Sequence, residues 1–125
     1  MSDRNSLVAA YLKTIGPDRD EHFWAFESVQ KLIRFGSFEA AEITLDLVEA
    51  CGSPVQLGYV AAGPLEDLIY GGNPDVFGFL TMHLDRSSKL RDAMHLVHME
   101  ESELTPDRTA LFKARGLKIH PDSPE

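Results

Sequence analysis

Signals that begin a helix recur along this chain at intervals of about 15 to 19 residues. A capping residue followed by proline stands at Ser53-Pro54, Asn73-Pro74 and Thr105-Pro106. Side chains of this kind accept hydrogen bonds from the first free amides of a helix, and proline fits its first position. With the weaker signals included, we expect helices to start near residues 5, 20, 37, 54, 73, 88 and 105.

Apolar residues repeat at helical spacing between these starts, as Leu7, Tyr11 and Ile15 do in the first segment. No stretch alternates apolar and polar residues long enough to predict a strand, and no Asn-Gly or Asp-Gly hairpin signal is present. The sequence therefore predicts an all-α protein of about six or seven short antiparallel helices. They form either a compact α-solenoid-like stack of helical hairpins or an irregular helical bundle. Residues 1–116 are expected to form a single helical domain, with 117–125 as an extended or frayed tail.

Phe23, Trp24 and Phe26 place three aromatic side chains within four residues, and we expect the helix that carries them to be a major contributor to the core.

The middle of the chain combines turn formers, two acids and an apolar face. The pattern Ser53-Pro54-Val55-Gln56 predicts a capping box, and the helix that it opens is expected to bend at Gly63-Pro64. The pattern leaves open whether the bend divides this helix into two. Leu65, Leu68 and Ile69 share one face, so we expect them to be buried.

The net charge of -8 is concentrated in one part of the chain. No lysine or arginine occurs between Arg34 and Arg86, and a segment of this kind repels phosphate groups. We therefore expect no nucleic-acid ligand and favour a basic protein partner. The acids in this interval are Glu39, Glu42, Asp46, Glu49, Glu66, Asp67, Asp75 and Asp85.

Four of these acids lie at i, i+3, i+7 and i+10 of the third predicted helix and form a stripe about 80° wide. Ile43 and Leu47 lie on the far side of the stripe, so this helix is expected to pack between neighbours with only the stripe exposed. Together with the acids of the central segment, the predicted partner-binding residues are Glu39, Glu42, Asp46, Glu49, Glu66 and Asp67.

The sequence gives weaker support for metal binding, catalysis or cofactor binding. His95 and His98 stand at i, i+3, but this pair is expected to lie on a solvated face and to bind no metal. Adjacent carboxylates at Glu66 and Asp67 diverge by about 100° on a helix, so a shared catalytic role requires a bend there. Cys51 is expected to be a small buried side chain, and no phosphate-binding glycine pattern is present, so no cofactor is predicted.

The pattern is typical of a small acidic module that masks a basic surface on a partner protein, as immunity proteins, antitoxins and inhibitors do. One alternative is a small enzyme or metal-binding protein that uses Glu66 and Asp67 or His95 and His98. Another is a self-associating scaffold with an exposed patch formed by Phe77, Phe79 and Phe112.

A single cysteine excludes an internal disulfide, and the N-terminal residues lack the order of a secretory signal. No apolar run approaches the roughly 20 residues of a membrane span. We therefore expect a cytoplasmic protein without a membrane partner. The oligomeric state is not predicted.

The chain resembles a family of short bacterial proteins that have no assigned activity and share an Ala-Ala-Gly-Pro-Leu-Glu-Asp-Leu-Leu core. The resemblance covers residues 7 to 99 and includes an upstream tryptophan helix, matched by Trp24. It extends to a downstream motif whose two aromatic positions are replaced in 90–98. It implies an all-helical domain and no particular chemistry. The core reads Ala61-Ala62-Gly63-Pro64-Leu65-Glu66-Asp67-Leu68-Ile69.

Overall fold

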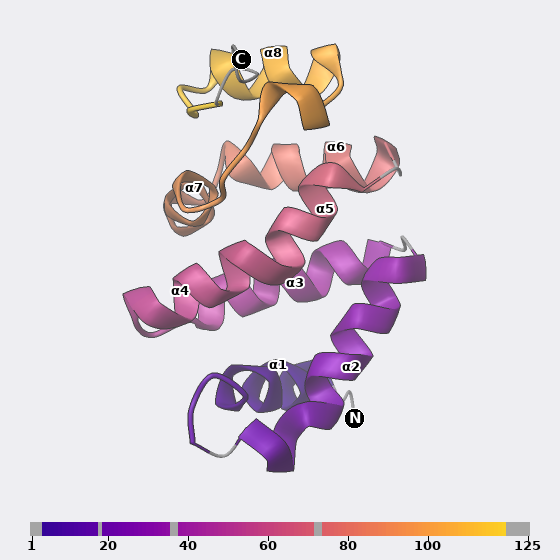
Figure 1. Cartoon of the computed structure of the whole chain (residues 1–125), viewed down its shortest axis with the longest axis vertical. Helices are drawn as coiled ribbons and strands as arrows, with labels where there is room; N and C mark the ends of the chain where they lie inside the picture. The colour runs from indigo at the N-terminus through magenta and orange to yellow at the C-terminus, as the bar shows by residue number, and fades with distance from the viewer. Residues whose placement is uncertain (1–3, 18, 36–37, 72–73, 120–125) are drawn as a thin grey trace.

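The computed structural model describes residues 4–17, 19–35, 38–71 and 74–119, and no strand forms within these ranges (Figure 1). The all-α prediction is confirmed, and a helix begins within one residue of each of the seven predicted starts. The predicted cap at Asn73 lies outside the described residues. In chain order the elements are α1 (Arg4–Lys13), α2 (Arg19–Phe35), α3 (Phe38–Ala50), α4 (Pro54–Val60), η1 (Ala61–Leu65), α5 (Glu66–Tyr70), α6 (Pro74–Leu84), α7 (Ser88–His95), η2 (Glu101–Glu103) and α8 (Pro106–Ala114).

The helices follow one another along the long axis of the molecule, from α1 and α2 at one end to α8 at the other (Figure 1). α3 lies in the middle and contacts α1, α2, α4, η1, α6 and α7. Phe38 is 50% exposed outside the acidic stripe, so the prediction that only the stripe is exposed is wrong. The buried side chains of α3 occupy a sector about 160° wide at about 100° per residue. They are Ala40, Ala41, Ile43, Thr44, Leu47 and Val48.

The central helix runs without interruption from Pro54 to Tyr70, but its middle turn, η1, is a π-helix. The amide of Glu66 donates to the carbonyl of Ala61, five residues earlier. Pro64 explains the wider turn, because proline has no amide hydrogen and its ring would clash with the carbonyl four residues back in an α-helix. The predicted bend is therefore a local change of helix type within one helical path.

Side chains at the end of η1 and in α5 belong to the core. Leu65 and Ile69 have no exposed surface and Leu68 is 5% exposed, so the prediction that this face is buried is confirmed. At the start of the same helical path, Ser53 Oγ accepts a hydrogen bond from the amide of Gln56 (3.2 Å), and Gln56 Oε1 accepts one from the amide of Gly52 (2.6 Å). Ser53 therefore caps the helix as the sequence predicts, whereas Gln56 binds the amide of Gly52 and not that of Ser53, so the predicted capping box forms only in part.

The prediction that three aromatic side chains make α2 a major contributor to the core is wrong for two of the three. Phe23 is 36% exposed and Trp24 is 51% exposed, whereas Ala25 and Val29 on the opposite side of α2 are buried. Only Phe26 packs against the core. The fully buried residues of α2 are therefore Ala25 and Val29, and the larger Phe26, Leu32 and Ile33 are half-buried against the core beside them.

The predicted exposed patch of three phenylalanines is also wrong. Phe77 and Phe112 are buried and contact each other edge to face, with ring centroids 5.4 Å apart, and Phe79 is half-buried. The core also extends beyond the predicted boundary at residue 116. The chain leaves α8 through Gly116 (φ 79°) and buries Leu117 and Ile119, while residues 120–125 lie outside the described part.

Two cationic side chains bind the carboxyl ends of helices that precede them in the chain. Lys89 Nζ donates to the carbonyls of Glu49 (2.9 Å) and Cys51 (2.5 Å), at the end of α3. Arg108 Nη1 donates to the carbonyls of Ile69 and Gly71, both at 2.7 Å, at the end of α5. Carbonyls at a helix end lack partners within the helix and carry a partial negative charge, so each cation stabilises a helix end.

Truncation of Leu68 to alanine is expected to lower the free energy of unfolding by about 2 to 5 kcal/mol, because it removes buried methyl groups and leaves a cavity. The control Leu96→Ala, at a side chain that is 52% exposed, should cost about 0.5 kcal/mol or less. Urea denaturation of the two variants measures the difference. Equal effects would contradict the central position of Leu68.

Arg108→Ala is expected to lower the free energy of unfolding by about 2 to 4 kcal/mol. It removes two charge-assisted hydrogen bonds and a guanidinium that lies 4.1 Å from the ring centroid of Phe77. Arg108→Lys should recover only part of the loss, because an ammonium cannot reproduce the planar stacking. The exposed Arg86 provides the control, and Arg86→Ala should change stability by about 0.5 kcal/mol or less. Thermal denaturation showing equal losses for the two alanine variants would rule out the proposed role of Arg108.

Candidate functional site: an acidic groove between α3 and α6

The two helices that form the candidate site run side by side in the same direction. Phe38, at the start of α3, contacts Phe79 of α6 edge to face, with ring centroids 5.6 Å apart. Near the end of α3, Glu49 Oε2 accepts a hydrogen bond from Ser87 Oγ at 2.7 Å, just beyond α6. α3 therefore presents its acidic stripe along α6.

Three of the four predicted stripe acids line one groove of about 280 Å³ between these helices. Glu42 and Glu49 are exposed and Asp46 is half-buried. The remaining lining residues come from both helices and the turn after α6. They are Leu45, Phe79, His83 and Ser87.

The opposite wall of the groove is aromatic. The imidazole of His83 lies against the ring of Phe79, with centroids 4.6 Å apart, and His83 Nδ1 lies 3.1 Å from the carbonyl oxygen of Phe79. A carbonyl oxygen only accepts hydrogen bonds, so Nδ1 carries the proton in the neutral ring. The groove thus combines carboxylates with an aromatic face, and no lysine or arginine is among its described lining residues.

The other predicted partner-binding acids are not part of this groove. Glu39 is exposed on the first turn of α3, outside the groove lining. Asp67 is exposed as a whole residue, but its carboxylate accepts a hydrogen bond from Gln30 of α2. Partial burial raises the pKa of the Asp67 carboxyl, and the Gln30 hydrogen bond opposes this effect more weakly.

Glu66 is half-buried and lies on the side of Tyr70. Burial raises the pKa of the Tyr70 hydroxyl most, and the negative charges of Glu103 and Glu66 raise it further. The hydroxyl of Tyr70 donates to the carbonyl of His98 (3.0 Å) and accepts from the amide of Glu100 (3.3 Å). Glu66 and Asp67 therefore face different neighbours, as expected for adjacent positions on a helix.

His95 and His98 are both exposed, and His98 Nε2 lies 3.0 Å from Glu100 Oε2. Within the described ranges, no three histidine, cysteine, aspartate or glutamate side chains gather in a way that could hold a metal ion. Cys51 is buried, burial raises the pKa of its thiol, and its Sγ donates to the carbonyl of Leu47. These features give neither a metal centre nor an activated nucleophile in the described part of the chain.

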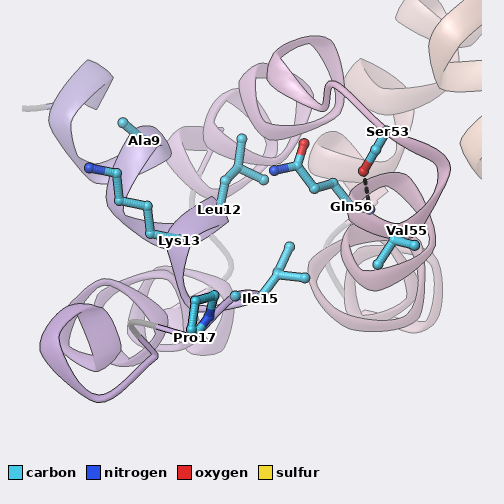
Figure 2. A pocket seen from close by; sticks show the side chains of 9 residues that line it. Ala9, Leu12, Lys13, Ile15, Pro17, Ser53, Val55 and Gln56 are labelled. Carbon is cyan, nitrogen blue, oxygen red and sulfur yellow. Dashed lines mark hydrogen bonds between the residues drawn. The ribbon is translucent and has the colours of Figure 1, made fainter.

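A second and larger groove, of about 520 Å³, lies between the end of α1 and the start of α4 (Figure 2). Leu12, Ile15 and Val55 give it an apolar lining, and Lys13 is the one charged side chain among its described lining residues. The oxygen atoms of Ser53 and Gln56 already cap the helix start, so this groove offers less specific chemistry than the acidic one.

Comparison of the chain with protein-family models, curated proteins and solved structures gives no match. None of the described helices combines the length and apolarity needed to cross a membrane.

Asp67→Asn is expected to raise the free energy of unfolding near pH 7, because the folded state holds a carboxyl whose pKa is raised by partial burial. A raised pKa means that the folded state binds the proton more tightly than the unfolded state, so ionisation opposes folding. This penalty appears as pH rises above the unfolded pKa of about 3.9 and is absent well below it.

Urea denaturation at pH 3 and pH 7 measures this change, and the advantage of the amide should shrink at the lower pH. Glu66→Gln removes the neighbouring carboxylate and serves as the control. If Asp67→Asn costs more than about 1 kcal/mol at pH 7, the carboxylate is tied into a stabilising network instead.

Proposed function

We propose that this chain is a small acidic protein-binding module that masks a basic surface on a partner protein, in the way that immunity proteins, antitoxins and inhibitors act. The observation that supports this proposal is the convergence of Glu42, Asp46 and Glu49 in one groove with an aromatic wall. A cytoplasmic location remains part of this proposal.

The groove suits an arginine or lysine side chain of a partner. Its volume of about 280 Å³ is below the roughly 300 to 1,000 Å³ typical of sites for small organic ligands, and it opens along the surface of two helices. The carboxylates can accept hydrogen bonds from a cationic head, while the ring of Phe79 can contact it through its face. An arginine fits best, because its guanidinium is planar and offers several donors.

The test replaces the four stripe acids by their amides, as Glu39→Gln, Glu42→Gln, Asp46→Asn and Glu49→Gln in one variant. The probe is a peptide that contains several arginines, and its affinity is measured by calorimetry at two salt concentrations. We expect binding to weaken at least about tenfold and to lose most of its salt dependence, because close charge pairs dominate such an interface.

A matched control distinguishes the groove from net charge alone. Glu21, Asp92, Glu101 and Glu103 are exposed acids outside the groove, and their amides also change the net charge from -8 to -4. This control should weaken peptide binding less than about threefold, since distant charges are screened. Equal losses in the two variants would mean that the stripe has no specific role.

A further inference from the structure

The outer face of α2 carries large aromatic side chains that no part of the described structure covers. Trp24 is 51% exposed and Phe35 is 82% exposed. These residues are eleven positions apart, which corresponds to three full turns and about 16 Å along the helix axis. Aromatic side chains exposed to this extent are typical anchors of protein interfaces.

Charged residues of both signs share this face. With Trp24 at 0° and about 100° per residue, Phe35 lies near 20°, Lys31 near -20°, Glu27 near -60° and Arg34 near -80°. All five are exposed, and they occupy a sector about 100° wide. The buried Ala25 and Val29 lie on the opposite side of the helix. The face is therefore a distinct surface directed away from the core.

The order of residues on this face is complementary to itself. When two copies of α2 are placed antiparallel across a two-fold axis near residue 29, each residue i lies opposite residue 58 − i or 59 − i of the other copy. Glu27 then faces Lys31, and Trp24 faces Phe35, with each contact occurring twice, while Arg34 lies at the edge of the face. Opposite charges are paired, and each indole meets the phenyl ring of the other copy.

We propose that the α2 face, formed by Trp24, Glu27, Lys31, Arg34 and Phe35, binds a second copy of this chain in an antiparallel, two-fold symmetric pair. A second copy fits better than a nucleic acid or an acidic protein, because the two acidic-basic pairs across the axis need both signs at fixed positions. The α2 face is separate from the acidic groove, so this pairing does not depend on the proposed function.

The tryptophan provides a direct measurement of this pairing, since Trp24 is the only tryptophan of the chain. Sedimentation equilibrium of the full chain should show a mass that rises from monomer to dimer with concentration. Over the same range the emission of Trp24 should shift to shorter wavelength as its ring leaves water. Trp24→Ala combined with Phe35→Ala should raise the dissociation constant at least about a hundredfold, because both anchors are lost. Val55→Ala, at an exposed apolar residue outside the α2 face, should leave it unchanged.

A charge exchange tests the antiparallel register. Glu27→Lys alone and Lys31→Glu alone should each raise the dissociation constant about tenfold, because each places like charges opposite each other at two symmetric positions. The double exchange Glu27→Lys with Lys31→Glu should restore the original value. Circular dichroism melts of the three variants check that the helix itself is retained.

A chain that stays monomeric at millimolar concentration would overturn the proposal, as would a dimer whose dissociation constant is unaffected by loss of Trp24 and Phe35. A double exchange that binds no better than the single variants would overturn the antiparallel arrangement. The four-amide variant of the acidic groove should dimerise normally, so a failure of the proposed function and a failure of this inference are distinguishable.

Discussion

Cations from the C-terminal third of the chain bind the carboxyl ends of the two helices at its centre, and the packing of the array depends on these contacts. Neither α3 nor α5 has a basic residue in its last turn. Lys89 supplies the positive charge at the end of α3, and Arg108 supplies it at the end of α5. Each contact joins segments 37 to 40 residues apart, so it stabilises a helix end and fixes the position of a later helix against it.

These contacts link the uneven distribution of charge along the chain to the packing of its helices. The interval without lysine or arginine contains both helix ends, and the residues that complete them come from beyond Arg86. The carboxylates of the acidic stripe take no part in these contacts, because Lys89 and Arg108 bind backbone carbonyls. The structure therefore separates the cations that hold the fold together from the acids that face the groove, although both belong to the same pattern of segregated charge.

Capping residues, prolines and apolar spacing predict the helix starts, the all-α class and the buried face of Leu65, Leu68 and Ile69, because these properties depend on local sequence. The exposure of Trp24 could not be predicted, because apolar side chains occur all round the first turns of α2 and local spacing cannot decide which face meets α1 and α3. Of the acidic groove, the sequence predicts only the acids on the α3 wall. Phe79 and His83 share a face of α6 at i, i+4, but nothing local indicates that α6 returns beside α3 in the same direction.

The π-turn at η1 also constrains how this gene can change. A π-turn holds one residue more than the α-helical turn that it replaces, so an in-frame loss of one codon, for example that of the exposed Ala62, would favour a regular α-helix. Pro64 opposes this outcome, because its ring would then clash with the carbonyl four residues earlier. A shortened chain would be kinked or broken here unless the proline codon also changed, so the length of the segment and the identity of residue 64 are coupled.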